Sequence, residues 1–390
     1  MHDFNLCLPT KIVFGRGIEA RIGTELKALG ATRVLLHFGS GSVRKSGLLD
    51  QVEASLTEAG LTFVEFGGAQ PNPRIELVRE GMEVCAREKI DFILAVGGGS
   101  AIDSAKLIAH GYATGRDPWE FIATGEKPDR TTPLGTVLTL SATGSEMSDS
   151  AVITNGDLKR GLSTPLNRPL ISFLNPENTF TVSKFQTGCG IVDTMMHTLE
   201  RYCTPDTDTD LTDRIAEALL VSVRDAGRVA IAYPDDYEAR ATLMWASTLS
   251  HNGLTGCGKD YAFTVHKLEH DISGLHPAVA HGAGLSVLFP AWMYEVMERD
   301  VRRFARLAVN VWGCTMDHDH PARTARAGID AMRAYFREIG MPTTMAELGV
   351  TPADYAAIAD LTTGGGTKTP PSCYGELTRE RILHIYTLAE

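Results

Sequence analysis

The sequence predicts an α/β plus all-α protein, with a doubly wound α/β domain over residues 1–178 and an all-helical domain over residues 179–390. Short β-branched runs alternate with helical stretches in the first 175 residues, which is typical of a parallel sheet with helices on both faces. After Asn175-Pro176 the strand pattern stops and long helical stretches follow. A chain of 390 residues also exceeds the size at which one hydrophobic core stops growing, so two domains are expected.

The elements of the first domain follow from its apolar runs and from the turn residues between them. Short apolar runs bounded by turn residues predict strands, and apolar residues at helical spacing predict helices. Gly60 closes the first expected helix, and the Pro71-Asn72-Pro73 turn precedes the second. The expected strands are 33–38, 61–66, 91–96, 134–140 and 171–174, and the expected helices are 47–60, roughly 74–89 and a third that follows Gly99.

The second domain is expected to consist of helices. Four long segments repeat apolar residues at helical spacing with almost no strand pattern between them. These segments are residues 212–232, 237–253, 300–313 and 324–340. The Gly/Pro-rich residues 362–376 predict a surface loop before a last helix.

The composition is that of a soluble globular protein, with 43% hydrophobic and 22% charged residues. No apolar run is long enough to cross a bilayer, and the N-terminus lacks the pattern of a signal peptide. Seven scattered cysteines do not suggest a disulfide framework, so we expect reduced thiols and a cytoplasmic location. The net charge of −11, without a basic stripe, argues against nucleic acid as a partner.

A glycine-rich loop joins the third expected strand to the next helix. Glycines let a backbone approach a phosphate closely, and a helix N-terminus offers free N–H donors and the positive end of a dipole. We therefore interpret this loop as a phosphate-binding loop, and the alternative is a tight strand-to-helix turn. The candidate cofactor-binding residues here are Gly98, Gly99, Ser100 and Asp103.

A second loop follows the first clear strand and has no acidic residue. Many NAD-binding domains place a carboxylate here for the ribose 2′-hydroxyl. Its absence, together with Arg44 and Lys45 nearby, favours the 2′-phosphate of NADP, so NADP(H) is expected in preference to NAD(H). The alternative is a solvated basic turn. The candidate residues are Gly39, Ser40, Gly41 and Ser42.

A third loop, residues 139–150, is rich in hydroxyl groups and also follows a strand. Its side chains offer hydrogen bonds for a pyrophosphate, a ribose or a carboxamide, although an ordinary Ser/Thr-capped turn has the same composition. The candidates are Thr139, Thr143, Ser145 and Ser148, with Lys159 further along the chain as a cation that is otherwise a surface lysine.

Histidines are concentrated in one short segment. Four of the twelve fall within sixteen residues, at His266, His270, His276 and His281. Imidazole is the commonest protein ligand for borderline transition metals. This density predicts a metal site, although a pair such as His266 and His270 on one helix face is by itself also typical of a hydrogen-bonded, partly buried pair.

A carboxylate and a further imidazole lie upstream. Asp193 and His197 are four residues apart in the apolar run GIVDTMMHTLERY, so on a helix they share one face. This pair alone is more typical of a hydrogen bond along a helix than of a metal site. Together with the histidine segment it supplies nitrogen and oxygen ligands that suit Fe²⁺ or Zn²⁺. The predicted metal ligands are Asp193, His197, His266 and His281.

In these motifs the chain resembles the iron-containing (group III) alcohol dehydrogenases, and most of all their NADPH-dependent butanol dehydrogenase and broad-range aldehyde reductase branch. The resemblance covers nearly the whole chain. It includes FNLCLPTKIVFGRG, FGSGSVRKSG, ILAVGGGSAIDSAK, TLSATGSEMS, GIVDTMMHTLERY and HKLEHDISGLHPAVAHG. The metal helix, the histidine segment and GGGSxxDxxK in this arrangement are together highly specific.

The resemblance implies a dinucleotide-binding α/β domain and a helical metal-binding domain of the dehydroquinate synthase-like fold, with the active site in the cleft between them. It implies that the metal is bound by the four predicted ligands and that His270 lies near the nicotinamide as a proton-relay group. It also implies a pyrophosphate on Gly98, Gly99 and Ser100, a 2′-phosphate at residues 39–42, and a homodimer. Thr139, Thr143, Ser148 and Lys159 fall at positions that line the cofactor in relatives.

Three features depart from the family pattern. Gln70 stands where many relatives have an acidic residue, and Asn175 replaces the aspartate of a common Leu-Asp-Pro. The loop Pro277–Ala280 is one residue longer than in close relatives and lies directly before His281. None of these changes removes a ligand, but the longer loop affects which substrate fits.

The resulting hypothesis is hydride transfer between NADP(H) and a small aldehyde or primary alcohol, with the metal as a Lewis acid on the substrate oxygen. Alternatives within the fold are a glycerol-type polyol dehydrogenase, a dehydroquinate-synthase-like lyase and a reductase of a specialised aldehyde, such as one carrying a phosphonate. Alternatives of other classes are a metallohydrolase and a non-catalytic nucleotide sensor.

Overall fold

The computed structural model describes residues 1–39 and 41–390. These residues form two compact units, each built from more than one segment of the chain. The helical unit comprises Met1–Leu6, Ser183–Tyr233 and Leu249–Glu390, and the sheet unit comprises Cys7–Val182 and Pro234–Thr248. The domain boundary expected between residues 178 and 179 stays a prediction.

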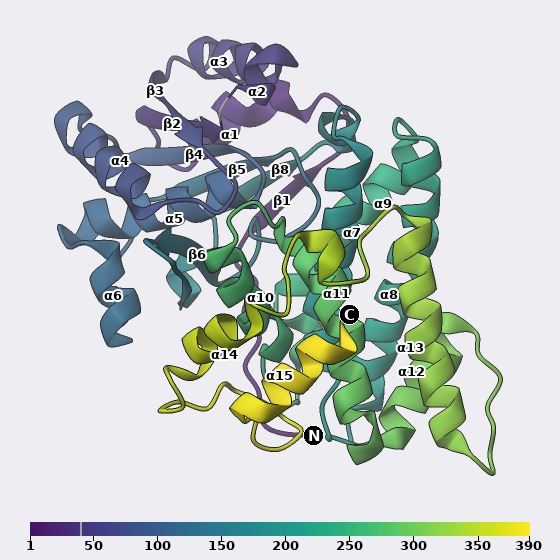
Figure 1. Cartoon of the computed structure of the whole chain (residues 1–390). Helices are drawn as coiled ribbons and strands as arrows, with labels where there is room; N and C mark the ends of the chain where they lie inside the picture. Colours follow the sequence, from purple (N-terminus) through teal and green to yellow (C-terminus); the bar gives the residue numbers. More distant parts are fainter. Residues whose placement is uncertain (40) are drawn as a thin grey trace. The chain divides into compact units, whose positions relative to one another are not determined.

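The sheet unit contains six parallel strands in the order β1-β8-β5-β4-β2-β3 (Figure 1). Their bounds are β1 Lys11–Phe14, β2 Arg33–Gly39, β3 Thr62–Ala69, β4 Phe92–Gly97, β5 Leu134–Leu138 and β8 Ile171–Leu174. The five expected strands are confirmed within a few residues. The edge strand β1 was not expected, since its four residues are too few to show a period.

Helices cover both faces of this sheet, as the alternation of side chains along β2 requires. Val34, Leu36 and Phe38 belong to one buried cluster, together with α1 (Ile22–Ala28), α2 (Ser42–Lys45) and α3 (Leu48–Glu58). Leu35 belongs to a second cluster, on the opposite face, with α4 (Ile75–Glu88) and α5 (Gly99–Thr114). Figure 1 shows α3 and α4 on opposite sides of the strands. The predicted doubly wound architecture is confirmed.

The strand order brings two of the glycine loops together. The sheet is wound outward in two directions from β2, to β3 on one side and to β4, β5 and β8 on the other. Ligands of such sheets bind beyond the carboxyl ends of the strands where the winding reverses. Phe38 of β2 pairs with Val96 of β4, so the loops that follow Gly39 and Gly97 begin at neighbouring strand ends.

A small antiparallel hairpin, β6 (Ser150–Asn155) and β7 (Leu158–Ser163), was not expected. Asn155 pairs with Leu158, so the two-residue turn is Gly156-Asp157, and Gly156 has a φ of 58°. Gly-Asp between two runs indicates a hairpin because glycine adopts positive φ freely at the first turn position, so this signal was available in the sequence. The short helix α6 (Pro118–Thr124) is capped by Asp117, which accepts a hydrogen bond from the Trp119 amide.

In the helical unit α11 is the central element. Its residues are almost all buried, and it packs against α7, α10, α13 and α15, which explains why it is apolar all round. The helices of this unit are α7 Lys184–Tyr202, α8 Asp210–Ala232, α10 Thr264–Leu275, α11 His281–Val296, α12 Val301–Trp312, α13 Pro321–Glu338, α14 Tyr355–Thr363 and α15 Arg379–Leu388. Helix α9 (Tyr237–His251) begins in the sheet unit and ends in the helical unit.

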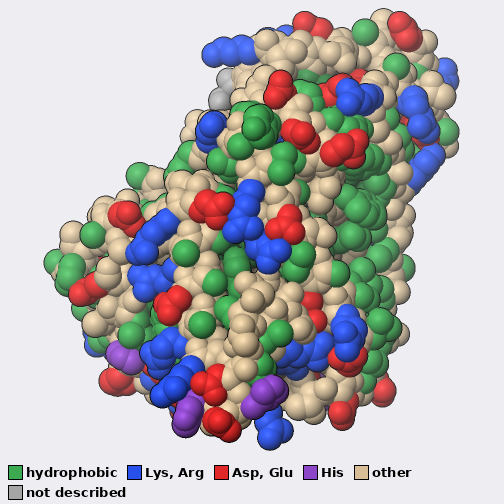
Figure 2. Space-filling view, turned by 90° about the vertical axis from the view of Figure 1, so that its right-hand side faces the viewer, with side chains coloured by type: hydrophobic (Ala, Val, Ile, Leu, Met, Phe, Trp, Pro, Cys, Tyr) green, Lys and Arg blue, Asp and Glu red, His purple; other side chains and the backbone are tan. Residues whose placement is uncertain are grey.

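The described helices include none with the length and apolar character needed to span a membrane. On the face drawn in Figure 2, basic and acidic side chains are interspersed over the surface. This face therefore carries no broad field of one charge sign.

Candidate metal centre and cofactor-binding loops

Helix α7 places Asp193 and His197 on one buried face. The helix begins after Ser183, whose hydroxyl accepts a hydrogen bond of 3.2 Å from the Gln186 amide. Asp193 and His197 are only 3% and 4% exposed. The Nε2 atom of His197 lies 3.6 Å from Oδ1 of Asp193, as the spacing of four residues predicts.

Helices α10 and α11 bring two further imidazoles to the same carboxylate oxygen. The Nε2 atoms of His266 and His281 each lie 3.6 Å from Oδ1 of Asp193. The ligand atoms of these three residues all lie within 4.8 Å of one another. The structure therefore brings all four predicted ligands together, although they come from three helices.

The equal distances of 3.6 Å fit a metal ion better than a hydrogen-bonded cluster. A contact of 3.6 Å is too long for a hydrogen bond, whereas ligand atoms about 2.0–2.2 Å from a tetrahedral ion are about 3.3–3.6 Å apart. Among the described residues, Asp193 Oδ1 and His266 Nε2 are buried without a hydrogen-bond partner. Buried polar atoms of this kind are costly unless something else satisfies them, and a divalent cation satisfies both.

Two buried glutamates contact the opposite ring nitrogens. Nδ1 of His266 lies 3.1 Å from Oε1 of Glu200, and Nδ1 of His281 is hydrogen-bonded to Glu269. Glu200 and Glu269 are 2% and 0% exposed. A carboxylate on Nδ1 favours the tautomer that leaves Nε2 free for a metal. Neither glutamate was predicted from the sequence, although Glu200 continues the stripe of Asp193 and His197 along α7.

Two glycines in the first turn of α11 make this packing sterically feasible. A Cβ atom on Gly282 would lie 2.3 Å from the backbone oxygen of Cys189, so only glycine lets α11 approach α7 this closely. A Cβ atom on Gly284 would lie 2.6 Å from Cγ of Glu269. The glycines that follow His281 in the sequence therefore have a packing role at this centre.

The pKa values of two of these imidazoles shift in opposite directions, because their charged neighbours differ. Burial, with neighbouring imidazoles, holds the pKa of His197 well below its ordinary value. Burial also opposes the charged form of His266, but the carboxylates of Asp193 and Glu200 outweigh it and raise that pKa to about 9. An imidazole must be neutral to bind a metal, so a cation bound here competes with a proton for His266.

The remaining histidines of the segment differ in their surroundings. The ring centroid of His270 lies 5.3 Å from that of His281, which places His270 beside the centre. His276 follows the end of α10 and lies 4.0 Å from Asp354. His251, which the sequence pattern did not single out, has its ring centroid 4.0 Å from that of His197. Its position at the end of α9 gave no periodic signal.

The loop after β2 lies at the winding reversal of the sheet unit. Gly39 ends the strand, Gly41 has a φ of 133° that favours glycine, and Ser42 begins α2. Ser40 lies outside the described residues. Arg44 forms an ion pair with Glu65 of β3, so part of its positive charge is neutralised within the chain.

The glycines after β4 allow the neighbouring loop to pack closely. A Cβ atom on Gly99 would lie 2.5 Å from Cγ2 of Thr143, and one on Gly98 would lie 3.2 Å from Cβ of Leu140. The Thr139 amide donates a hydrogen bond of 3.1 Å to the Gly97 carbonyl. The loop after Gly97 and the loop of residues 139–150 therefore lie against each other at neighbouring strand ends.

Asp103 and Lys106 hold the third loop in place. Asp103 accepts hydrogen bonds from the Ser145 hydroxyl (2.5 Å) and from the Val152 amide (2.9 Å). Lys106 donates to the Ser145 hydroxyl (2.8 Å) and to the Ser148 carbonyl (3.2 Å). Burial raises the pKa of Asp103 and lowers that of Lys106 to about 8. The prediction that Asp103 binds the cofactor stays a prediction; in the structure each of its oxygens accepts a hydrogen bond from the chain itself.

The other predicted cofactor residues differ in exposure. Ser148 is 1% exposed and donates a hydrogen bond of 3.3 Å to the Ser150 carbonyl, and Lys159 of β7 is 5% exposed. Ser100, Thr139 and Thr143 are half-buried. These three half-buried residues are accessible to a ligand. The proposed cofactor contacts of all the residues in this paragraph stay predictions.

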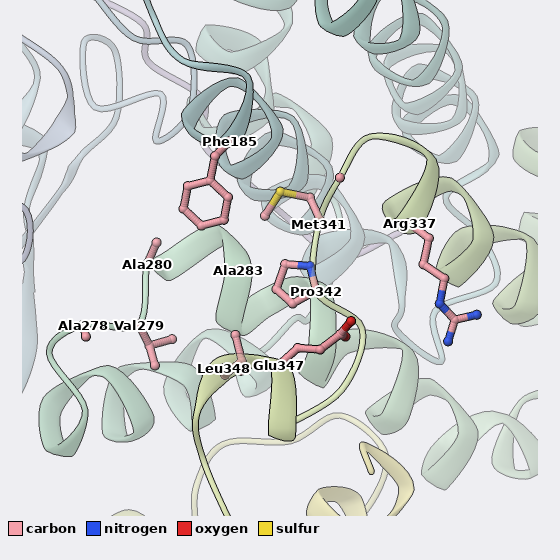
Figure 3. A pocket seen from close by; sticks show the side chains of 11 residues that line it. Phe185, Ala278, Val279, Ala280, Ala283, Arg337, Met341, Pro342, Glu347 and Leu348 are labelled. Atoms are coloured by element: carbon pink, nitrogen blue, oxygen red, sulfur yellow. The ribbon is translucent and has the colours of Figure 1, made fainter.

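A pocket of about 490 Å³ lies in the helical unit beside the loop that precedes His281 (Figure 3). Ala278, Val279 and Ala280 of this loop form one wall, and the Phe185 ring of α7 forms another. The remaining lining residues are Ala283, Arg337, Gly340, Met341, Pro342, Glu347 and Leu348. The loop that was expected to be longer than in relatives therefore lines a cavity with both apolar and charged walls.

The two parts of the chain match two models of one protein family. Residues 9–176 match the model described as iron-containing alcohol dehydrogenase, and residues 187–389 match its C-terminal counterpart. The chain is 41% identical to the NADH-dependent butanol dehydrogenase A of Clostridium acetobutylicum, over 90% of each chain. It is 36% identical to the NADPH-dependent aldehyde reductase YqhD of Escherichia coli, over 92% of each chain.

Solved structures agree with these matches. The crystal structure of NADH-dependent butanol dehydrogenase A from Thermotoga maritima superposes with a TM-score of 0.95 at 36% identity. The alignment covers 100% of this chain and 99% of that one.

Proposed function

Since the chain belongs to the iron-containing alcohol dehydrogenase family and is therefore an oxidoreductase of alcohols or aldehydes, we propose that it transfers a hydride between NADP(H) and a small aldehyde or primary alcohol. The observation that carries this proposal is the meeting of three imidazole Nε2 atoms, each 3.6 Å from Oδ1 of Asp193.

The metal-binding residues in this proposal are Asp193, His197, His266 and His281. Fe²⁺ or Zn²⁺ bound by them would act as a Lewis acid on the substrate oxygen. The chain's own contribution is to hold these four side chains on buried helices, so that the donor atoms need little rearrangement when a cation binds.

We assign the proton transfer to His270, directly or through water. Its ring lies one helical turn beyond His266 and 5.3 Å, between centroids, from His281. It is half-buried, so it can exchange protons with solvent as a general acid must. Reduction of an aldehyde consumes one proton for each hydride. His270 would deliver this proton to the oxygen atom that becomes the alcohol.

We propose NADP(H) as the preferred cofactor. Gly39, Gly41 and Ser42 present no carboxylate to a 2′-phosphate, and the nearby Glu65 is occupied by its ion pair with Arg44. Relatives are named both for NADH, as in the butanol dehydrogenases, and for NADPH, as in YqhD. We therefore infer the preference of this chain between NADP(H) and NAD(H) from its own loop at residues 39–42.

The decisive experiment compares His266→Ala with His276→Ala. The second variant is a control, because it removes an imidazole of the same segment that does not contact Asp193. Both variants are stripped of metal, reloaded with Fe²⁺ or Zn²⁺, and assayed with NADPH and NADH on a panel that includes butanal, a phosphonate-bearing aldehyde and, in the oxidation direction with NADP⁺, glycerol. We expect His266→Ala to lose both the metal and the activity while its circular dichroism spectrum is unchanged, and the control to keep both. A fully active His266→Ala enzyme without bound metal refutes the proposal.

A further inference from the structure

We propose that Glu200 and Glu269 are positioning residues that set how tightly the metal is bound, by holding the rings of His266 and His281 with Nε2 directed toward Asp193. This inference rests on the proposed metal centre. Neither glutamate lies within the set of predicted ligands, and each contacts the ring nitrogen on the far side of a ligand.

Glu200 is itself held firmly at the start of α10. Its carboxylate accepts hydrogen bonds from the backbone amides of Thr264 (3.0 Å) and His266 (2.9 Å), and it also contacts Nδ1 of His266 at 3.1 Å. It therefore joins α7 to the first turn of α10 and fixes both the backbone and the ring of one ligand. A ring fixed in this way loses little entropy when the metal binds.

Glu269 performs the same task for His281, and Gly284 makes room for it. Its carboxylate is hydrogen-bonded to Nδ1 of His281. Gly284 passes so close that a Cβ atom there would lie 2.6 Å from Cγ and 2.9 Å from Oε1 of Glu269. The carboxylate therefore has a single well-defined position, which depends on the absence of a side chain at residue 284.

The burial of these carboxylates supports a role toward a cation. Glu200, Glu269 and Asp193 are all at most 3% exposed, and removing a carboxylate from water is costly unless a positive charge compensates it. A carboxylate that accepts a hydrogen bond from the Nδ1–H of a ligand imidazole also raises the basicity of the ligand, and losing such a partner usually costs 10- to 100-fold in metal affinity.

The test measures Zn²⁺ affinity by competition with a chelator for the wild type, Glu269→Ala, Glu269→Gln and Glu200→Gln. We expect about 10- to 100-fold weaker binding for Glu269→Ala, with smaller losses for the two glutamine variants, because an amide oxygen still accepts the Nδ1 hydrogen. Glu217→Ala is the matched control. Glu217 is a buried glutamate of α8 that bonds Tyr202 and Arg306, so its loss is expected to lower stability but to leave Zn²⁺ affinity within about twofold.

Gly284→Ala perturbs the carboxylate of Glu269 without removing it, because the added Cβ atom would lie 2.6 Å from Cγ of Glu269. We expect Gly284→Ala to weaken Zn²⁺ binding. The Zn²⁺ affinity of the double variant Gly284→Ala/Glu269→Gln should be no lower than that of whichever single variant binds Zn²⁺ less tightly, because both substitutions act through one contact. Folded Glu269→Ala and Glu200→Gln proteins that bind Zn²⁺ as tightly as the wild type refute the inference and leave the proposed function intact. A wild-type protein that binds no metal refutes the proposed function itself.

Discussion

The ammonium group of Lys106 donates a hydrogen bond of 2.7 Å to the backbone carbonyl of Ser150, across 44 residues of sequence. Lys106 is 1% exposed, and its side chain connects α5 to the end of the hydroxyl-rich loop. The loop that is proposed to contact the cofactor is thus positioned by a buried charge that does not itself need to touch the cofactor.

We expect Lys106→Met to raise the KM for NADPH roughly tenfold or more, because small displacements of positioning groups are expensive in catalysis. The free energy of unfolding should fall by about 3 kcal/mol, since the substitution leaves Asp103 and Glu146 buried without their cation. Steady-state kinetics and urea unfolding measure the two effects. Lys11→Met removes an exposed lysine that pairs with Glu25 and should cost less than about 1 kcal/mol. Equal, small effects of both substitutions contradict the role of Lys106.

The burial of His37 leads us to expect that the folded protein loses stability in mild acid. His37 is fully buried between the Phe66 carbonyl and the Ser104 hydroxyl, and burial lowers its pKa from 6.5 to about 4. Between these two pH values the unfolded chain binds a proton that the folded chain does not, so stability falls as the pH falls through 6.5. We expect this residue to cost about 2 kcal/mol between pH 7 and pH 5.

Urea unfolding of the wild type and of His37→Asn at both pH values isolates this contribution. The variant starts from a lower stability at pH 7 but should lose about 2 kcal/mol less than the wild type on acidification. The same pH dependence in both proteins shows that other groups are responsible.

Ser42→Asp tests the proposed position of the 2′-phosphate. A carboxylate at the start of α2 repels that phosphate, so the KM for NADPH should rise roughly tenfold while that for NADH changes little. Ser46→Asp places the same charge on an exposed residue at the other end of α2 and is the control. If Ser42→Asp leaves the KM for NADPH unchanged, the phosphate binds elsewhere.

His270→Ala tests the proton-transfer role. Because His270 is not one of the proposed ligands, we expect the variant to retain its metal while kcat falls about 10²-fold. Metal analysis and kcat are measured on the same preparation, with His276→Ala as the matched loss of a half-buried histidine. Loss of metal in His270→Ala means that the residue supports the centre rather than transferring a proton.

The local part of the metal centre was predictable from periodicity. Asp193 and His197 share a helix face because they are four residues apart. Glu200 lies on the same face by the same rule, but it was not predicted to take part in the metal centre. Glu269 follows His266 by three residues on α10 and so shares a face with it by the same rule, whereas His251 offered no such signal. That Glu269 contacts His281 and that His251 lies beside His197 depend on how α9, α10 and α11 pack, which spacing along one helix does not specify.

Similarly, the cofactor loops were visible as glycine and hydroxyl patterns, but their interior contacts were not. Gly99 was interpreted as a place where a phosphate approaches, and the structure shows in addition that it accommodates Thr143. Asp103 was predicted to bind the cofactor, and the structure shows it bonded to Ser145 and Val152. Both contacts join segments about 40 or more residues apart, and no local pattern encodes them.

By itself the sequence determined the succession of strands and helices, the doubly wound class and the residue types of the metal centre, because these depend on the period of apolar residues and on ligand chemistry. Only the tertiary structure decided that Asp193, His266 and His281 share one point, which glutamate supports which ring, and where a glycine is sterically required. These relationships depend on the distance between backbones that pack against each other, and that distance is set by many buried side chains acting together.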